Sequence, residues 1–323
     1  MNKPISTIVI TVDVEDWAQS TWDCSLPLSD HSADNTRKLL EIFAEFPQVR
    51  GTFFVLGKFA DQYPHIVKEI KQARHDIGSH GWGHIDLFHL SKNEFREDIR
   101  RSTESIANII GERPVGYRAP DFSIVGETLW ALEILAEEGY TYDSSIFPIG
   151  NARYGIIAWP REATQVKLKT GNTITEFPLA TLDLFRCRLP IGGGGYARLL
   201  PGVVLVRAFR KAQAQLSTPP VFYCHPYEID SQEFKKMDIK VPLKVQLHQG
   251  IGRKQTAAKM RRLLKNFECI SLSEAMTRYN NLAVIDYGPY TLEPGSVVRP
   301  PIFKAERPFG TTENKSFGAS SEP

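Results

Sequence analysis

The chain has 323 residues, of which 42% are hydrophobic and 24% are charged, as is usual for a globular enzyme. Lys and Arg number 39 and Asp and Glu 37, so the net charge of +2 favours neither a nucleic-acid partner nor general attraction to an anionic surface. The cysteines, Cys24, Cys187, Cys224 and Cys269, form no Cys-x-x-Cys pair. This spacing argues against a zinc ribbon or a disulfide framework and favours a reducing compartment.

No stretch approaches the roughly 18 apolar residues of a membrane span, and the first apolar segment is too short for a signal peptide. We therefore expect a cytoplasmic protein without a transmembrane segment. Peripheral contact with a membrane through a lipid-linked substrate stays open at this stage.

Short apolar strands alternate with amphipathic helices along residues 1–280, a pattern typical of an α/β protein with parallel strands. We expect strands at 7–14, 51–56, 76–79, 116–118, 141–144, 175–179, 221–224 and 268–272. We expect helices at 35–46, 63–73, 91–110 and 127–138. Residues 159–169 with the turn at 170–172 predict a β-hairpin insertion. Residues 281–323 are rich in Pro, Gly and Ser and predict an extended, partly disordered tail outside the catalytic domain.

Polar residues suited to catalysis follow several of these strands at their C-terminal ends. They are Asp13, His80, Arg118, Asp143 and His225. Because active sites of parallel barrels assemble at the carboxyl ends of the strands, we expect these side chains to meet at one rim.

Two histidines and an acidic cluster predict a divalent-metal site. His80 and His84 are four residues apart, and Asp13, Glu15 and Asp16 place three carboxylates within four residues. Carboxylates this close repel one another unless a cation compensates them. Two imidazoles and one carboxylate leave coordination positions open for water, and a second carboxylate is then free to act as a general base.

Arg118 and His225 complete this set of candidate catalytic residues. An arginine beside the carboxylates would orient the base through charge-assisted hydrogen bonds. A histidine titrates near neutral pH and can therefore donate a proton to a leaving amine.

Taken in order, these motifs resemble those of the polysaccharide deacetylases of carbohydrate esterase family 4, which share the NodB homology domain. The matching segments are Thr11-Val12-Asp13, His80-Gly81-Trp82-Gly83-His84, Arg118-Ala119-Pro120, Asp143-Ser144-Ser145 and His225. The resemblance implies a distorted (β/α) barrel of about seven parallel strands and a metal ion that is usually zinc. It also implies Asp13 as base, His80 and His84 as metal ligands, Arg118 as the tether of the base and His225 as acid.

The resemblance further implies a metal-dependent N-deacetylase acting on an N-acetylated amino sugar of a surface polysaccharide or its precursor. The first motif departs from the family pattern, so the third metal ligand is either Glu15 or Asp16. The third motif departs as well, because Asp121 and Phe122 follow the proline where the family has an aromatic residue directly. Candidate substrate contacts are Trp17, Trp82, Pro120, Asp121, Phe122, Asp143, Ser144 and Tyr196.

A narrower resemblance lies in the last third of the domain, about residues 181–280. The segment 189–201, with its Gly192–Gly195 run, and the segment 225–230 are similar to deacetylases of exopolysaccharide and exosortase (PEP-CTERM) loci. The glycine run lacks the Lys-Ser/Thr of a phosphate-binding loop and is better explained as a substrate loop. Two alternatives stay open: hydrolysis of a cyclic or non-sugar amide, as in allantoinase-like relatives, and a non-catalytic glycan-binding module.

Overall fold

The computed structural model describes residues 6–151, 153–237 and 239–296; the disorder predicted for the end of the chain lies outside these residues. The strands are β1 (Thr7–Val14), β2 (Thr52–Val55), β3 (Asp76–Ser79), β4 (Gly116–Tyr117), β5 (Tyr142–Asp143), β6 (Thr164–Lys167), β7 (Thr173–Glu176), β8 (Thr181–Leu184), β9 (Cys187–Pro190), β10 (Val221–Cys224), β11 (Glu268–Ile270) and β12 (Ala283–Asp286). The helices are α1 (Asp30–Ala44), α2 (Gly57–Gln62), α3 (Pro64–Gln72), α4 (Lys92–Ile110), α5 (Ala131–Glu137), α6 (Gly194–Leu199), α7 (Gly202–Gln213), α8 (Glu233–Lys236), α9 (Leu243–Gly250), α10 (Arg253–Asn266) and α11 (Leu272–Arg278).

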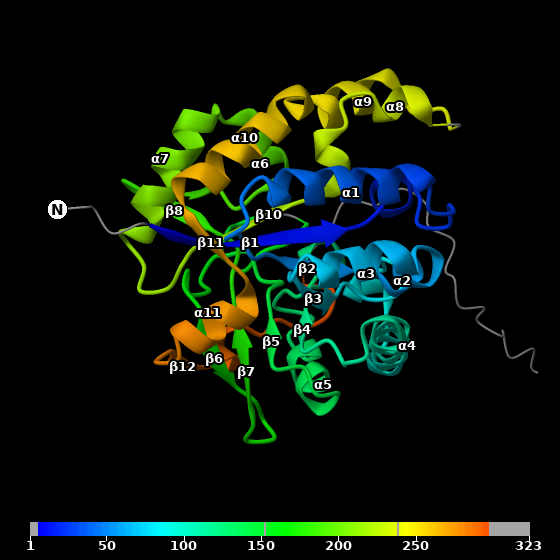
Figure 1. The fold of residues 1–323 in the computed structure, drawn as a ribbon. Coiled ribbons are helices and arrows are strands. Elements are labelled where there is room, and N and C mark those ends of the chain that lie inside the picture. Colours follow the sequence, from blue (N-terminus) through cyan, green and yellow to red (C-terminus); the bar gives the residue numbers. More distant parts are fainter. Residues whose placement is uncertain (1–5, 152, 238, 297–323) are drawn as a thin grey trace, which may run out of the picture.

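Seven parallel strands of the described chain form a distorted barrel, in the order β10-β1-β2-β3-β4-β5-β7. An isolated parallel bridge between Leu179, just after β7, and Val221 of β10 joins the two ends of this order. Helices surround the strands, and β1 runs through the centre of the view in Figure 1. The predicted (β/α) barrel of about seven parallel strands is therefore confirmed.

The predicted hairpin insertion is also confirmed. Strands β6 and β7 pair antiparallel across the turn at residues 168–172. The segment after residue 281, expected to be extended, contributes β12, which pairs parallel with β6. A second hairpin, β8–β9, was not predicted. Its strands are half exposed and only four residues long, and they lack the continuous apolar character of the barrel strands. The sequence pattern is therefore too short to predict them.

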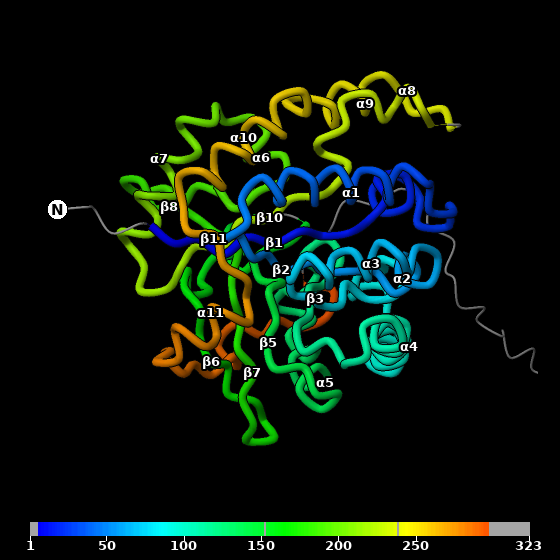
Figure 2. The backbone as a smooth tube through the Cα atoms, in the orientation of Figure 1, coloured from blue at the N-terminus to red at the C-terminus, as the bar shows by residue number. Residues whose placement is uncertain are grey.

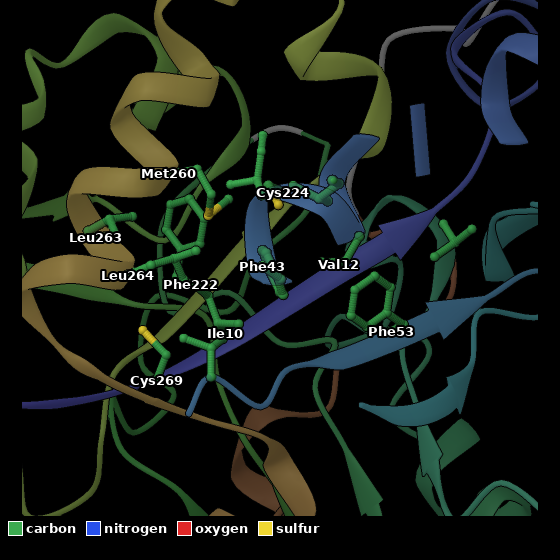
Figure 3. Packing of buried hydrophobic residues seen from close by; sticks show 14 of the residues in the cluster. Ile10, Val12, Phe43, Phe53, Phe222, Cys224, Met260, Leu263, Leu264 and Cys269 are labelled. Carbon is green, nitrogen blue, oxygen red and sulfur yellow. The ribbon is translucent and has the colours of Figure 1, made fainter. Parts of the chain in front are cut away.

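The side chains of β1 explain how the barrel positions polar groups. Ile10 and Val12 point to the outer face, where they pack with residues of β10, α1 and α10, as Figure 3 shows. Because successive strand residues point to opposite faces, Thr11 and Asp13 face the barrel interior. Cys224 belongs to the outer cluster and is buried, so it is a packed thiol.

Candidate metal centre and active site

Glu15, His80 and His84 form a buried cluster that can hold a metal ion. Glu15 follows β1, His80 follows β3, and His84 lies on the loop after β3. Glu15 Oε2 lies 3.3 Å from His80 Nε2 and 2.7 Å from His84 Nε2. The three candidate ligand atoms all lie within 4.8 Å of one another. The structure thus brings both predicted histidines together with one of the two predicted carboxylates.

The surrounding backbone orients the histidines. His80 Nδ1 lies 2.8 Å from the Arg118 carbonyl oxygen and donates to it, so the ring presents Nε2 to Glu15. His84 has a left-handed backbone (φ 59°), which turns the loop back toward β1. The loop is held at Trp82, whose backbone N–H donates to the Asp98 carboxylate at 2.9 Å.

The electrostatics of this cluster fit a bound cation. Glu15 Oε2 is buried without a well-formed hydrogen bond, although two imidazole nitrogens lie close to it. Burial raises the pKa of Glu15, but the charges of His84 and His225 and the close approach of the two cluster histidines lower it well below its usual range. Burial lowers the pKa of His84, but Glu15 overcomes this and raises it to about 9. Two imidazoles and a carboxylate are the donor types found in open zinc sites.

Asp16 has a different environment. Its Oδ1 accepts hydrogen bonds from the backbone N–H groups of Ala18 and Gln19, at 2.8 and 3.2 Å. Its Oδ2 accepts from the backbone N–H of Ser29 at 2.9 Å and also from the Ser29 hydroxyl. Both oxygens of Asp16 therefore hold the loop between β1 and α1.

Asp13 and Arg118 form a fully buried ion pair beside the cluster, with Arg118 Nη1 2.8 Å from Asp13 Oδ1. The guanidinium also donates to the Thr11 hydroxyl, the Ser144 hydroxyl and the Ser144 carbonyl oxygen, each at 2.7 Å. Its carbon lies 4.4 Å from the centre of the Phe54 ring. Because four hydrogen bonds fix its plane, Arg118 holds the Asp13 carboxylate in one orientation.

His225 faces both carboxylates from β10. Its Nε2 lies 3.4 Å from Glu15 Oε1 and 3.9 Å from Asp13 Oδ2, while its Nδ1 lies 3.6 Å from Glu228 Oε1. The imidazole stacks on the Tyr227 ring at 4.8 Å, and the Tyr227 hydroxyl donates to Glu15 Oε1 at 3.2 Å. Burial lowers the pKa of His225, but Glu15 and Glu228 together raise it above its ordinary value.

A cavity of about 460 Å³ opens over these groups and is lined by residues from both halves of the chain. Asp13, Glu15, His80, His84 and His225 all line it. Among the predicted substrate contacts, Asp121, Phe122 and Tyr196 line it as well. Asp121 and Phe122 both have positive φ values, 51° and 53°, so the backbone after Pro120 is left-handed. This turn brings Asp121 and Phe122 to the same cavity.

The two tryptophans predicted as sugar platforms do not line this cavity. Trp17 is fully buried, lies parallel to Trp22 and meets Phe234 edge-on, so it is a core residue. Trp82 is covered on one face by the Arg101 guanidinium at 3.3 Å, and its Nε1 donates to Asp61. The structure therefore places Trp17 in the core and Trp82 against Arg101, both outside the cavity lining.

Pro120, Asp143 and Ser144 are also buried and do not line the cavity. Pro120 packs against Gly81. Asp143 accepts from the hydroxyl and the backbone N–H of Ser145, at 2.6 and 3.2 Å. Ser144 binds Arg118, as described above. The structure therefore places these three predicted substrate contacts outside the cavity lining.

Several cavity residues were missed by the sequence interpretation: Arg153, Tyr154, Tyr227 and Glu228. Arg198 Nη1 lies 3.1 Å from Glu228 Oε1, and both side chains are buried. Tyr227 and Glu228 directly follow His225 and Pro226, so their proximity to a candidate acid was the available signal. Arg153 and Tyr154 lie in an irregular segment that carries no such signal.

The glycine run 192–195 packs closely against β10. A Cβ atom on Gly193 would lie 1.9 Å from the Tyr223 carbonyl oxygen, and one on Gly194 would lie 2.5 Å from the Tyr223 hydroxyl. Gly194 and Gly195 also line the cavity. The run therefore lets the backbone before α6 approach both the strand and the site.

Two family models match the chain in succession. Residues 2–142 match the family described as Polysaccharide deacetylase. The chain carries a polysaccharide deacetylase domain. It is of the NodB or carbohydrate esterase family 4 type. Residues 144–277 match a domain of unknown function (DUF3473). The deacetylase match thus includes the Glu15, His80 and His84 cluster with Asp13 and Arg118, and the second match includes His225.

Relatives of known name cover only part of the chain. A peptidoglycan-N-acetylglucosamine deacetylase of Bacillus cereus is 34% identical over 99 residues, which are 30% of this chain and 36% of that protein. The chain thus spans about a third of the length of the curated relatives it matches.

Two solved structures share the fold of this chain. One, from Mycobacterium smegmatis, is assigned to the polysaccharide deacetylases, has a TM-score of 0.57 at 17% identity, and covers 93% of this chain and 97% of its own. The other is the allantoinase Puue, with a TM-score of 0.56 at 15% identity, covering 86% of this chain and 94% of its own. In the described part of the chain, every helix is too short or too polar to cross a membrane.

Proposed function

We propose that this protein is a metal-dependent N-deacetylase that hydrolyses the acetamido group of an N-acetylated amino sugar and releases acetate. The observation that carries this proposal is the meeting of three chemical parts in one cavity. These are the Glu15, His80 and His84 cluster, the Asp13 carboxylate fixed by Arg118, and the His225 imidazole. The deacetylase match of residues 2–142 supports the same reaction class.

We propose Glu15, rather than Asp16, as the third metal ligand beside His80 and His84. Glu15 Oε2 faces both Nε2 atoms, whereas both oxygens of Asp16 accept hydrogen bonds from the β1–α1 loop. A divalent metal ion such as Zn²⁺ held there would polarise the amide carbonyl and lower the pKa of water.

Asp13 is the proposed general base. Its carboxylate lies at the cavity with one oxygen on Arg118 and the other toward His225. The Arg118 contact fixes the direction in which the free oxygen of Asp13 accepts a proton from the attacking water. Arg118 is a positioning residue, because it acts through Asp13.

His225 is the proposed general acid. Its Nε2 points to the same space as Asp13, and its Nδ1 lies near Glu228, which in turn pairs with Arg198. Stacking on Tyr227 fixes the plane of the ring. His225 donates its Nε2 proton to the nitrogen of the scissile amide, so that the free amine leaves and acetate remains.

The substrate we propose belongs to a surface polysaccharide or its precursor. Phe122, Tyr154 and Tyr196 bring three aromatic side chains to the cavity and offer apolar surfaces for sugar rings. The match of residues 144–277 covers the region that resembles deacetylases of exopolysaccharide and exosortase loci, and we propose that this region selects the glycan. The four free cysteines, including the exposed Cys187, support action in a reducing, cytoplasmic setting.

The experiment is metal analysis of the purified chain coupled to an acetate-release screen over N-acetylated oligosaccharides. A cyclic ureide is assayed in parallel for ring opening. We expect one divalent ion per chain and acetate release that stops on chelation and returns with Zn²⁺. Ring opening without acetate release would replace the proposal by an amidohydrolase on cyclic amides. Glycan binding with no turnover in the metal-loaded protein would support the non-catalytic module instead.

A further inference from the structure

Helix α9 carries an exposed apolar stripe. Leu243 and Leu247 lie one turn apart on the same side of α9, and Ile251 follows at the same four-residue interval, directly after the helix ends at Gly250. Their exposed fractions are 68%, 67% and 52%, and α9 contributes no buried residue to the core. Because these side chains stay largely exposed, their burial contributes little to the free energy of folding. Their apolar character therefore points to a partner.

A second exposed apolar segment adjoins the stripe. Leu199 ends α6 and Val203 begins α7, with exposed fractions of 62% and 45%. The two segments touch, because a Cβ atom on Gly252 would lie 2.4 Å from the Arg198 carbonyl oxygen. Leu199 and Ile251 also line the active-site cavity. We call these five residues, Leu199, Val203, Leu243, Leu247 and Ile251, the α9 face; it borders the cavity mouth.

The two segments that carry the α9 face are rich in basic residues, of which Arg198, Arg253 and Arg261 pair with acidic side chains. The sequence holds six Lys and Arg and no acidic residue between Asp183 and Glu228, and eight Lys and Arg and no acidic residue between Asp238 and Glu268. The rest of the chain then has 25 basic and 37 acidic residues, so the small net charge of the whole chain conceals a strong asymmetry. A basic region of this kind attracts anionic surfaces.

Further basic side chains are exposed on or next to the elements that carry the α9 face. They are Lys240, Lys244 and Lys254 near α9, and Arg207 and Arg262 on α7 and α10. None of these five forms an ion pair with a described residue. An apolar stripe flanked by such cations is the pattern of a helix that lies in a membrane interface.

We propose that the α9 face docks onto an anionic lipid bilayer. The leucines and Ile251 enter the headgroup region, and the flanking lysines and arginines contact the lipid phosphates. The occupant is a bilayer rather than a second copy of this chain, because self-association would bring like charges together. It is a bilayer rather than a nucleic acid, because the centre of the face is aliphatic, whereas nucleic-acid interfaces are polar or offer aromatic rings.

Docking in this way sets the position of the active site. Because Leu199 and Ile251 belong to both the α9 face and the cavity wall, the cavity mouth opens beside the membrane surface. This inference rests on the proposed deacetylase function. Together they imply a substrate class, an N-acetylated sugar that is tethered to a lipid anchor. The sugar would enter the cavity while its anchor stays in the bilayer.

The test is co-sedimentation of the full chain with vesicles of phosphatidylcholine alone or mixed with phosphatidylglycerol. We expect binding only to the anionic vesicles, weakening as salt increases. K244Q/K254Q should lower the partition coefficient about thirtyfold, and L243S/L247S at least about a hundredfold. The matched control K68Q/K167Q removes two exposed lysines on α3 and on the β6–β7 hairpin, which lie away from α9 in Figure 2, and should bind as the wild type does.

Circular dichroism checks that each variant is folded, which we expect because the substituted positions are exposed. The docking proposal would be overturned if K68Q/K167Q lost as much vesicle binding as K244Q/K254Q. It would also be overturned if the wild-type chain bound a DNA duplex but not vesicles. An activity arm compares one N-acetylated oligosaccharide free and lipid-anchored in vesicles. L243S/L247S should lose activity only on the anchored form. Vesicle binding without any acetate release would refute the proposed function and leave the docking surface standing.

Discussion

The two matched regions of the chain contribute different parts of the active site. Residues 2–142 supply Asp13, Glu15, His80, His84 and Arg118 from the ends of β1, β3 and β4. Residues 144–277 supply His225, the Arg198–Glu228 pair, Tyr196 and the α9 face. The first region binds metal and activates water in the proposed reaction, whereas the second delivers the proton and forms the cavity wall. Substitutions in the two regions should therefore fail in different ways.

The largest effect is expected at the proposed metal ligand. Glu15→Gln should remove the carboxylate that faces both histidines, with loss of bound metal and a fall in kcat of more than 10²-fold. Asp16→Asn is the matched control, because both residues are buried acids of the same loop. It should keep the metal and instead lower the free energy of unfolding by about 1–3 kcal/mol, through its lost hydrogen bonds. Metal analysis and denaturant titration of the two variants measure the bound metal and the free energy of unfolding. Loss of metal in the Asp16 variant but not in the Glu15 variant would reverse the ligand assignment.

A substitution in the second region should separate chemistry from metal binding. His225→Ala should lower kcat about 10²- to 10⁴-fold while the metal content stays at the wild-type level. His248→Ala is the control, since His248 lines the same cavity from exposed α9 but faces neither carboxylate. Steady-state kinetics with metal analysis check both variants. Near-normal turnover of the His225 variant would remove it from the proposed mechanism.

The first region should also show a pH-dependent stability that does not involve the active site. His75 is buried between Phe43 and Phe53, and its Nδ1 accepts the Gly51 backbone N–H at 3.2 Å. Burial lowers the pKa of His75 to about 4. Between pH 6.5 and about 4, His75 is protonated in the unfolded chain but neutral in the folded chain. The free energy of unfolding therefore falls as the pH falls through this range.

This loss at His75 should reach about 3 kcal/mol. Unfolding free energies measured across the range should be flatter with pH in His75→Gln, which keeps an acceptor but does not titrate. An unchanged slope in that variant would show that another group is responsible.

The smallest effect is expected at the cavity wall. Tyr196→Ala removes an aromatic side chain that lines the cavity, and it should raise KM about tenfold with little change in kcat. Trp82→Phe is the comparison, because Trp82 is covered by Arg101 and lies outside the cavity lining. Its KM should match that of the wild type. A larger change in KM for Trp82→Phe would restore it as a substrate contact.

The two regions also differ in how far their structures could be predicted from the sequence. In the first region, polar residues follow uniformly apolar strands, and the barrel and the capping box of α4, from Ser91 to Glu94, follow from local patterns. The choice between Glu15 and Asp16 could not be made from spacing, because it depends on the Ser29 contact thirteen residues away. The sequence also could not place Trp17 and Trp82 outside the cavity lining, because an aromatic residue near a motif packs inward as readily as outward.

In the second region the cavity wall is built by contacts between distant segments. Arg198 contacts Glu228, thirty residues away, and the wall also includes Asp121 and Phe122, which a left-handed turn of the first region brings to the cavity. The β8–β9 hairpin has no strong periodicity of its own. Such features depend on tertiary packing and leave little trace in local sequence.

Arg118 contributes to the site through both its side chain and its backbone. The guanidinium holds Asp13, and the carbonyl oxygen of the same residue holds His80. A displacement of this strand end would therefore act on the proposed base and on the proposed metal ligand together. Arg118 thus couples the positions of two side chains that lie at the ends of different strands.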